Sequence, residues 1–297
     1  MDGESNSGGQ GVRRFRCWWP WLCGFGLLCA AVAIIGYPTA ERDGRMMGNP
    51  HYDDGPTTES YGFRWSTPDE PYLQRLRTEY SLERIVGGAA DDYAKVRALA
   101  LWAHNLWQHH GENEPRNHDP ISILEEVRQG KKFRCVEYAV VISGCLNALG
   151  IPSRVLALKT EDVETRKSGA GHVVAEAYVR DLDKWILVDG QWDVIPLLDE
   201  IPLSAVELQQ ALAENRPELA IHTGSDSKPA EYFKWIGPYL FYLDVSLDNR
   251  VAVADRSCAR LMLVPVGAKK PTVFQQDFPI RDMVYTHSVR AFYAKPG

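Results

Sequence analysis

Three residues of the sequence have the types and spacing to activate a sulfur nucleophile: Cys135, His172 and Asp189. His172 opens a strand-like run behind the flexible segment SGAG, and Asp189 ends the apolar run WILV, where an unpaired carboxylate is costly. A hairpin turn centred near Asp181 brings His172 and Asp189 within one or two register steps. A base that takes the thiol proton and a carboxylate that holds the base's tautomer are what thiol catalysis requires.

Cys135 is the first residue of a predicted helix and follows a basic stretch at 131–134, KKFR. The helix N-terminus and nearby cations both stabilise a thiolate, which is the nucleophilic form of cysteine. Cys145 lies ten residues along the same helix, so about 15 Å separates the two, beyond the roughly 7 Å limit for a disulfide. Cys145 is interpreted as a packed small residue or as a disulfide partner of Cys258.

The elements that must position these residues follow from periodicity and helix-stop signals. Apolar residues recur every three or four positions from near Asp91, and Asp119-Pro120 starts a short helix that Gly130 ends. The Cys135 helix runs to 149, where Gly150 stops it. Strands are predicted at 154–160, 172–179 and 184–190. Ser204 and Glu207 have capping-box spacing, and 228–297 holds short strand-like runs that could form an add-on sheet.

The blocks FRCVEYAVVISGCLNALGIPSRVL, GAGHVVAEAYV and DKWILVDGQWD resemble the transglutaminase-like cysteine superfamily, in the same order, over about residues 90–195. The resemblance implies Cys135 as nucleophile, His172 as base and acid, and Asp189 as the orienting acid. It also implies an α+β fold, with a papain-like core in which the nucleophile helix packs on an antiparallel sheet. Two departures, Phe133-Arg134 before the cysteine and Gly190 after the aspartate, remove no reacting group.

Weaker signals surround this constellation. The backbone N–H of Cys135 is a natural oxyanion donor, and Gln129 has the spacing of the glutamine that serves this role in papain-like proteases, or is a solvated helix end. Trp192 could wall a cleft or belong to the core. The histidines of HNLWQHH lack the i, i+4 spacing of a shared helical face, so no metal and no cofactor are expected.

The run at positions 17–37 carries no charge, follows three arginines and has a tryptophan cluster at the arginine end. This pattern favours a transmembrane anchor with its N-terminus inside and the remaining chain outside the cytoplasm. A cleaved signal peptide is the competing interpretation. The predicted segments are a disordered tail at 1–16, the anchor at 17–37, a linker at 38–70, a transglutaminase-like domain at 71–200 and a β-rich C-terminal extension at 201–297.

The chain has 297 residues and a net charge of −6, which suits a globular protein and argues against a nucleic-acid-binding surface. The sequence thus predicts a membrane-anchored, extracytoplasmic thiol enzyme. It would act on glutamine carboxamides or peptide bonds of a protein or peptide substrate through a thioester. Cross-linking, deamidation and proteolysis stay open, as does the oligomeric state. The alternative is a catalytically silent binding or assembly module of the same fold.

Overall fold

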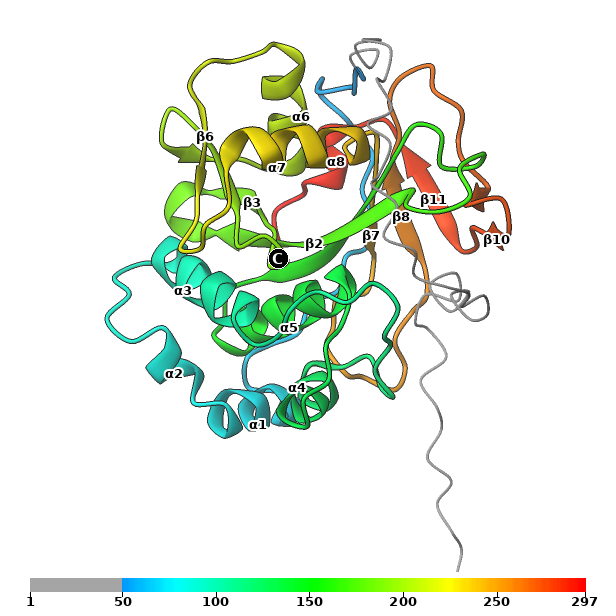
Figure 1. Ribbon diagram of the computed structural model, residues 1–297. Helices are drawn as coiled ribbons and strands as arrows, with labels where there is room; N and C mark the ends of the chain where they lie inside the picture. The colour runs from blue at the N-terminus through cyan, green and yellow to red at the C-terminus, as the bar shows by residue number, and fades with distance from the viewer. Residues whose placement is uncertain (1–49) are drawn as a thin grey trace, which may run out of the picture.

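The fold is built on one six-stranded mixed sheet (Figure 1). The computed structural model describes residues 50–297. The strands lie in the order β11-β8-β7-β1-β2-β3, and neighbours are antiparallel except for β11, which is parallel to β8. Their bounds are β1 (Ser153–Lys159), β2 (Gly171–Val179), β3 (Lys184–Val188), β7 (Tyr242–Ser246), β8 (Arg260–Leu263) and β11 (Met283–Thr286).

Helices cover both faces of this sheet, which gives an α+β architecture (Figure 1). One face carries α1 (Pro71–Glu79), α2 (Leu82–Ile85), α3 (Asp92–His104), α4 (Pro120–Arg128) and α5 (Cys135–Ala148). The other carries α6 (Ala205–Ala213), α7 (Pro229–Ile236) and α8 (Val289–Phe292). Successive strand residues alternate between the two cores: Ala157 packs on the α5 side, and Leu156 and Leu158 on the α7 side.

Short elements complete the described part of the chain. Three strands form a small sheet in the order β5-β4-β6, and two more form a ribbon, β10-β9. Their bounds are β4 (Ile195–Leu198), β5 (Ile201–Pro202), β6 (Leu219–His222), β9 (Val273–Phe274) and β10 (Phe278–Pro279). Two single-turn 3₁₀ helices, η1 (Arg180–Leu182) and η2 (Gly237–Tyr239), follow β2 and α7 respectively.

Helix α5 is buried on every side, because α1, α3 and α4 pack against it and it lies on β1 and β2. Its start is fixed by Glu137, whose Oε2 accepts the Arg134 backbone N–H at 3.1 Å. Its end follows the predicted signal: Leu149 is the C-cap, and Gly150 has a φ of +76°, which a residue with a side chain rarely adopts. Every residue of α5 after Cys135 is buried.

The structure confirms most predicted elements within a residue or two. Helix α3 starts at Asp92 with Asp91 as its N-cap, and Ser204 and Glu207 make the predicted reciprocal cap of α6. The strands expected after residue 228 exist as β7, β8 and β11. They do not form an add-on sheet, because β7 pairs directly with β1. The antiparallel sheet expected beneath the nucleophile helix is present as β1, β2 and β3. The whole sheet is mixed, because the connection from Leu263 to Met283 is long enough to return β11 parallel to β8.

The predicted anchor at 17–37 lies outside the described residues. Between residues 50 and 297, no helix combines the length and the apolar character that a bilayer crossing needs. Residues 50–70, within the predicted linker, contact the C-terminal half of the chain: the Tyr52 hydroxyl donates to the Phe241 carbonyl at 2.9 Å, and Arg64 pairs with Asp248. The segment boundaries given above stay predictions.

Candidate active site

His172 and Asp189 meet on the face of the sheet that α7 covers. Val188 lies opposite Ala175 in the β2–β3 ladder, so the next residue, Asp189, falls opposite Val174, two positions from His172 on the same face. The imidazole Nε2 lies 2.8 Å from Asp189 Oδ2. Both side chains are buried, with 2% and 0% exposure, so the pair is shielded from solvent.

Cys135 lies on the other side of the same imidazole. It is the half-buried first residue of α5, and its side chain is near enough to the imidazole to raise the pKa of His172. Because Asp189 occupies Nε2, the nitrogen left for the thiol is Nδ1. The structure therefore brings together all three residues singled out by the sequence, with the imidazole in the middle.

Burial and the two partners of His172, Asp189 and Cys135, have opposite effects on the pKa of its imidazole. Burial has the largest effect and lowers the pKa of the imidazole, while the Asp189 carboxylate and then Cys135 raise it. The partners prevail and raise the pKa of His172 to about 10. The ring is thus held as an imidazolium between two acidic groups at neutral pH.

Asp189 is satisfied by four donors. Besides His172, its Oδ2 accepts the Tyr232 hydroxyl at 3.3 Å. Its Oδ1 accepts the backbone N–H groups of Gln191 at 3.0 Å and Trp192 at 3.3 Å. These bonds offset the cost of burying the carboxylate and fix its direction. Tyr232 belongs to α7, far along the chain, and no local pattern in the sequence links it to Asp189.

The turn after Asp189 is hydrogen-bonded to His104 of α3 and packs closely on Ile142 of α5. His104 Nδ1 lies 3.2 Å from the Gly190 carbonyl oxygen and 3.1 Å from that of Gln191, so the ring N–H donates to this turn. A Cβ at Gly190 would lie 2.4 Å from Ile142 Cδ1. The close approach of α5 explains why glycine follows the aspartate. From the sequence, His104 could be identified only as one of the histidines of HNLWQHH.

Aromatic rings enclose the imidazole from the α7 side. Trp235 makes an edge contact with His172 at 4.6 Å between ring centroids, and Tyr239 lies at 6.1 Å. Trp192, predicted as a cleft wall or a core residue, packs on Trp235 at 5.1 Å and is part of this aromatic layer. Trp235 and Tyr239 also line a cavity of about 430 Å³, so an open space adjoins the rings that touch His172.

The loop before Cys135 is anchored by Trp107, which follows α3, and by the first turn of α5. Trp107 Nε1 donates to the Phe133 carbonyl at 3.2 Å, and Trp107 stacks on Tyr138 at 4.1 Å. The Arg134 guanidinium pairs with Glu137 at 2.9 Å. The arginine at this departure from the family pattern therefore stabilises the start of the nucleophile helix.

The basic residues before Cys135 are committed elsewhere. Lys131 pairs with Glu126, Lys132 donates to Gln108 at 2.9 Å, and Arg134 pairs with glutamates. The expectation that these cations act directly on the thiol is not what the structure shows: the cation in contact with Cys135 is His172. A sequence pattern gives the number of nearby charges and not the direction of flexible side chains.

The remaining candidates lie apart from this cluster. Gln129 is the exposed C-cap of α4. Cys145 is fully buried, burial raises the pKa of its thiol, and both it and Cys135 are free thiols, so neither is bridged to Cys258. Across residues 50–297, no group of three or more His, Cys, Asp and Glu side chains is arranged to hold a metal ion.

Residues 80–190 match the sequence model of the transglutaminase-like superfamily. No curated protein matches the chain. Similar solved structures include a candidate cysteine protease from Cytophaga hutchinsonii, at 16% identity and a TM-score of 0.34, covering 60% of this chain and 57% of that one. Another is a TGase, at 21% identity and a TM-score of 0.30, covering 40% and 31%. A third is a candidate protease from Parabacteroides distasonis, at 20% identity and a TM-score of 0.28, covering 38% and 25%.

The chain therefore spans less than two thirds of the length of each of these three solved proteins. The sequence match is confined to 80–190 and takes in the elements from α2 to the turn after β3. The segment that carries Cys135, His172 and Asp189 is of the transglutaminase-like superfamily.

Proposed function

We propose that this chain is a thiol enzyme that acts on amide bonds through a thioester. The observation that supports the proposal is the position of the His172 ring between Cys135 and Asp189, with the imidazole charged at neutral pH. A thiol next to an imidazolium gains thiolate character, and the thiolate is the attacking species. The carboxylate stabilises the cation and fixes the ring orientation.

The reaction has two halves. The Cys135 sulfur attacks the carbonyl carbon of a glutamine carboxamide or a peptide bond, and the C–N bond breaks while His172 gives its Nδ1 proton to the leaving nitrogen. The resulting thioester is then attacked by an amine or by water, whose proton returns to His172, and the sulfur leaves. An amine gives cross-linking; water gives deamidation or proteolysis, according to the substrate.

The backbone N–H of Cys135 supports the developing oxyanion in this proposal. It is in the first turn of α5, where backbone N–H groups have no partner inside the helix. The exposed position of Gln129 on α4 gives no support for a role of that side chain. The substrate is a protein or peptide that reaches the thiol beside the aromatic layer of Trp192, Trp235 and Tyr239.

The proposed location follows from the sequence alone. The uncharged run 17–37 behind three arginines would anchor the chain in a membrane with the catalytic domain outside the cytoplasm. Tagging the N-terminus and residue 297 and testing protease access in sealed cells or vesicles checks this. Protection of the N-terminal tag with exposure of the C-terminal tag is expected, and two tags on the same side would contradict the proposal.

The activity is tested with the full chain in detergent or nanodiscs, using three readouts. They are incorporation of a fluorescent amine into dimethylated casein, ammonia release from glutamine peptides, and cleavage of labelled casein. At least one should be positive, and Cys135→Ala should abolish it while the folded state remains. Cys145→Ala is the matched control, since that thiol is buried in the middle of the same helix and should leave turnover intact.

Two outcomes would contradict the proposal. Turnover that survives in Cys135→Ala would assign the chemistry to another group. Absence of all three activities, together with a Cys135 thiol that iodoacetamide does not alkylate, would favour the silent binding module. Alkylation of Cys135 in the wild-type chain that is slowed by His172→Gln is the result expected of an activated thiol.

A further inference from the structure

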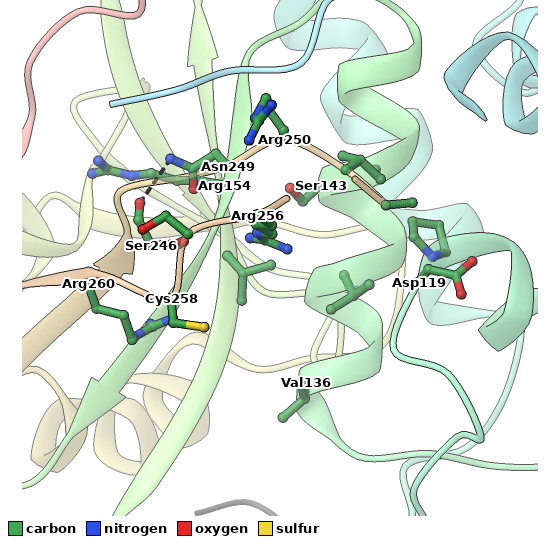
Figure 2. A pocket seen from close by; sticks show the side chains of 17 residues that line it. Asp119, Val136, Ser143, Arg154, Ser246, Asn249, Arg250, Arg256, Cys258 and Arg260 are labelled. Atoms are coloured by element: carbon green, nitrogen blue, oxygen red, sulfur yellow. Dashed lines mark hydrogen bonds between the residues drawn. The ribbon is translucent and has the colours of Figure 1, made fainter. Parts of the chain in front are cut away.

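A second cavity, of about 80 Å³, lies between α5 and the segment 246–260, away from the His172 ring (Figure 2). The α5 side is formed by Val136, Val140, Ser143 and Gly144. The opposite side is formed by the segment that joins β7 to β8. The volume is well above the roughly 15 Å³ that a single water needs, so the cavity admits a small polyatomic ion.

The charge of the cavity lining is one-sided. The lining includes four arginines and a single acidic residue, Asp119. That carboxylate is occupied as the N-cap of α4, where it accepts the Ser122 backbone N–H at 3.1 Å. Figure 2 shows Arg256 in the middle of the pocket, between Ser246 and Ser143. A cavity bordered by guanidinium groups and hydroxyls attracts oxyanions.

The arginines are held in place by carboxylates behind the lining. Asp248 pairs with Arg250 at 2.7 Å and also accepts the Ser257 backbone N–H at 3.1 Å, which fixes the shape of the segment. Its backbone carbonyl accepts Arg256 Nε at 2.8 Å. Arg260 pairs with Asp244, a carboxylate that it shares with Lys159. The site is thus preorganised, because the ends of the guanidinium groups are oriented before any ligand arrives.

Burial lowers the pKa of both Arg256 and Arg260, because their charges have lost solvation. An anion in the cavity would give these groups a charged partner in addition to the Asp248 carbonyl that Arg256 contacts and the Asp244 carboxylate that Arg260 contacts. Neutral groups complete the lining. They are the hydroxyl of Ser143, that of Ser246, which already donates to the Asp248 carbonyl at 2.8 Å, and Asn249, whose amide donates to the Ser246 carbonyl at 2.9 Å.

We propose that this cavity is a binding site for a small oxyanion of the phosphate type, recognised by Arg250, Arg256 and Arg260 with Ser143. The site lies along α5, and Val136, which lines it, directly follows Cys135. The proposal of an anion site does not depend on the thiol chemistry proposed above. The anion is inorganic phosphate or the phosphoryl group of a small phosphomonoester, since both present the same oxygens.

Binding is measured on the full chain by the thermal unfolding midpoint, with phosphate or glycerol phosphate replacing chloride at constant ionic strength. A saturable rise in the midpoint is expected, and the ligand with the lower half-saturation concentration identifies the source of the anion. Arg256→Gln should raise that concentration at least ten-fold. Arg75→Gln removes the same charge from an exposed, ion-paired position on α1 and should leave it unchanged. An equal response in both variants, or a rise that chloride reproduces, would show an ionic-strength effect only and overturn the proposal.

A second measurement does not depend on how well the variants fold. Wild-type crystals grown with selenate, a tetrahedral oxyanion, should give a selenium anomalous peak within hydrogen-bond distance of the Arg256 guanidinium. Displacement of that peak by phosphate at equal concentration is expected. A cavity without a selenium peak in crystals that diffract well enough to show one would refute the site.

Discussion

Replacing Asp189 with asparagine tests the electrostatics on which the proposed chemistry depends. The substitution keeps the shape of the side chain and removes the negative charge 2.8 Å from His172 Nε2. With the amide oxygen in the place of Oδ1, the two backbone donors on the turn keep their acceptor. The amide NH2 then lies in the place of Oδ2, where it donates to His172 Nε2 or to the Tyr232 hydroxyl oxygen. The change therefore isolates the charge from the packing of the turn.

The expected size of the effect follows from the state of the ring. The pKa of His172 is about 10 against an ordinary value of 6.5, a difference worth about 5 kcal/mol in favour of the charged form. Burial opposes that charge, and Asp189 is the larger of the two groups that restore it, ahead of Cys135. Asp189→Asn should lower the pKa by at least about two pH units, and Cys135→Ala by less.

The assay is a ¹³C and ¹⁵N titration of histidine-labelled full chain, which needs no substrate. The sequence has eight histidines, and His172→Gln assigns the signal. The raised pKa of His172 also makes the free energy of unfolding depend on pH. Because the folded pKa is raised, this stabilisation is complete below about pH 6.5 and is lost as the pH rises through about 10. The pH dependence of urea unfolding should flatten between these values in Asp189→Asn.

The reasoning is refuted if His172 of the wild-type chain titrates at or below 6.5, because its partners then do not overcome burial. It is also refuted if Asp189→Asn leaves the titration near 10. A Cys135→Ala effect larger than that of Asp189→Asn would show instead that the thiol is the main partner of the ring.

Three further substitutions have definite outcomes. Gly190→Ala should lower the free energy of unfolding in urea by about 1–3 kcal/mol, because the new methyl overlaps Ile142 Cδ1. Ile142→Val should recover part of that loss in the double variant, and additive losses from the two substitutions would contradict the close approach. Glu176→Gln should cost about 3–5 kcal/mol in the same assay, because it leaves Arg154 buried without its carboxylate; a loss under about 1 kcal/mol would show that the pair is dispensable. Tyr232→Phe should reduce turnover no more than about ten-fold, since Asp189 keeps three other donors, and complete loss would mean that the hydroxyl meets the substrate.

The local part of this architecture can be predicted from the sequence. The apolar pattern, Gly150 and the proline that follows it predict helix α5. Alternating apolar and polar residues on either side of a polar turn predict the β2–β3 hairpin. These signals depend on interactions between residues close in the chain, so a single sequence contains them. They suffice to bring His172 and Asp189 within one or two register steps and to put Cys135 at a helix start. The register that places both side chains on one face is seen only in the structure.

The parts that could not be predicted depend on contacts between distant segments. Tyr232 and Trp235 come from α7, which is far from His172 along the chain, and no spacing rule relates the two. The role of His104 at the turn depends on how α3 is docked. The arginine cavity requires a segment of the C-terminal region to lie along α5, which only the sheet order β8-β7-β1 brings about. Tertiary packing decides each of these.

The central position of β1 in the sheet has a consequence for any shortened form of the chain. Its partners are β2 on one side and β7 on the other, and β7 lies beyond the superfamily match at 80–190. Cleavage after residue 200 would remove β7 and make β1 an edge strand. Its backbone donors and acceptors on that side would then be unpaired, and the apolar Leu156 and Leu158 would lose the residues that cover them. Such edges recruit strands from other molecules. The isolated superfamily segment should therefore aggregate during expression, whereas the longer chain stays dispersed.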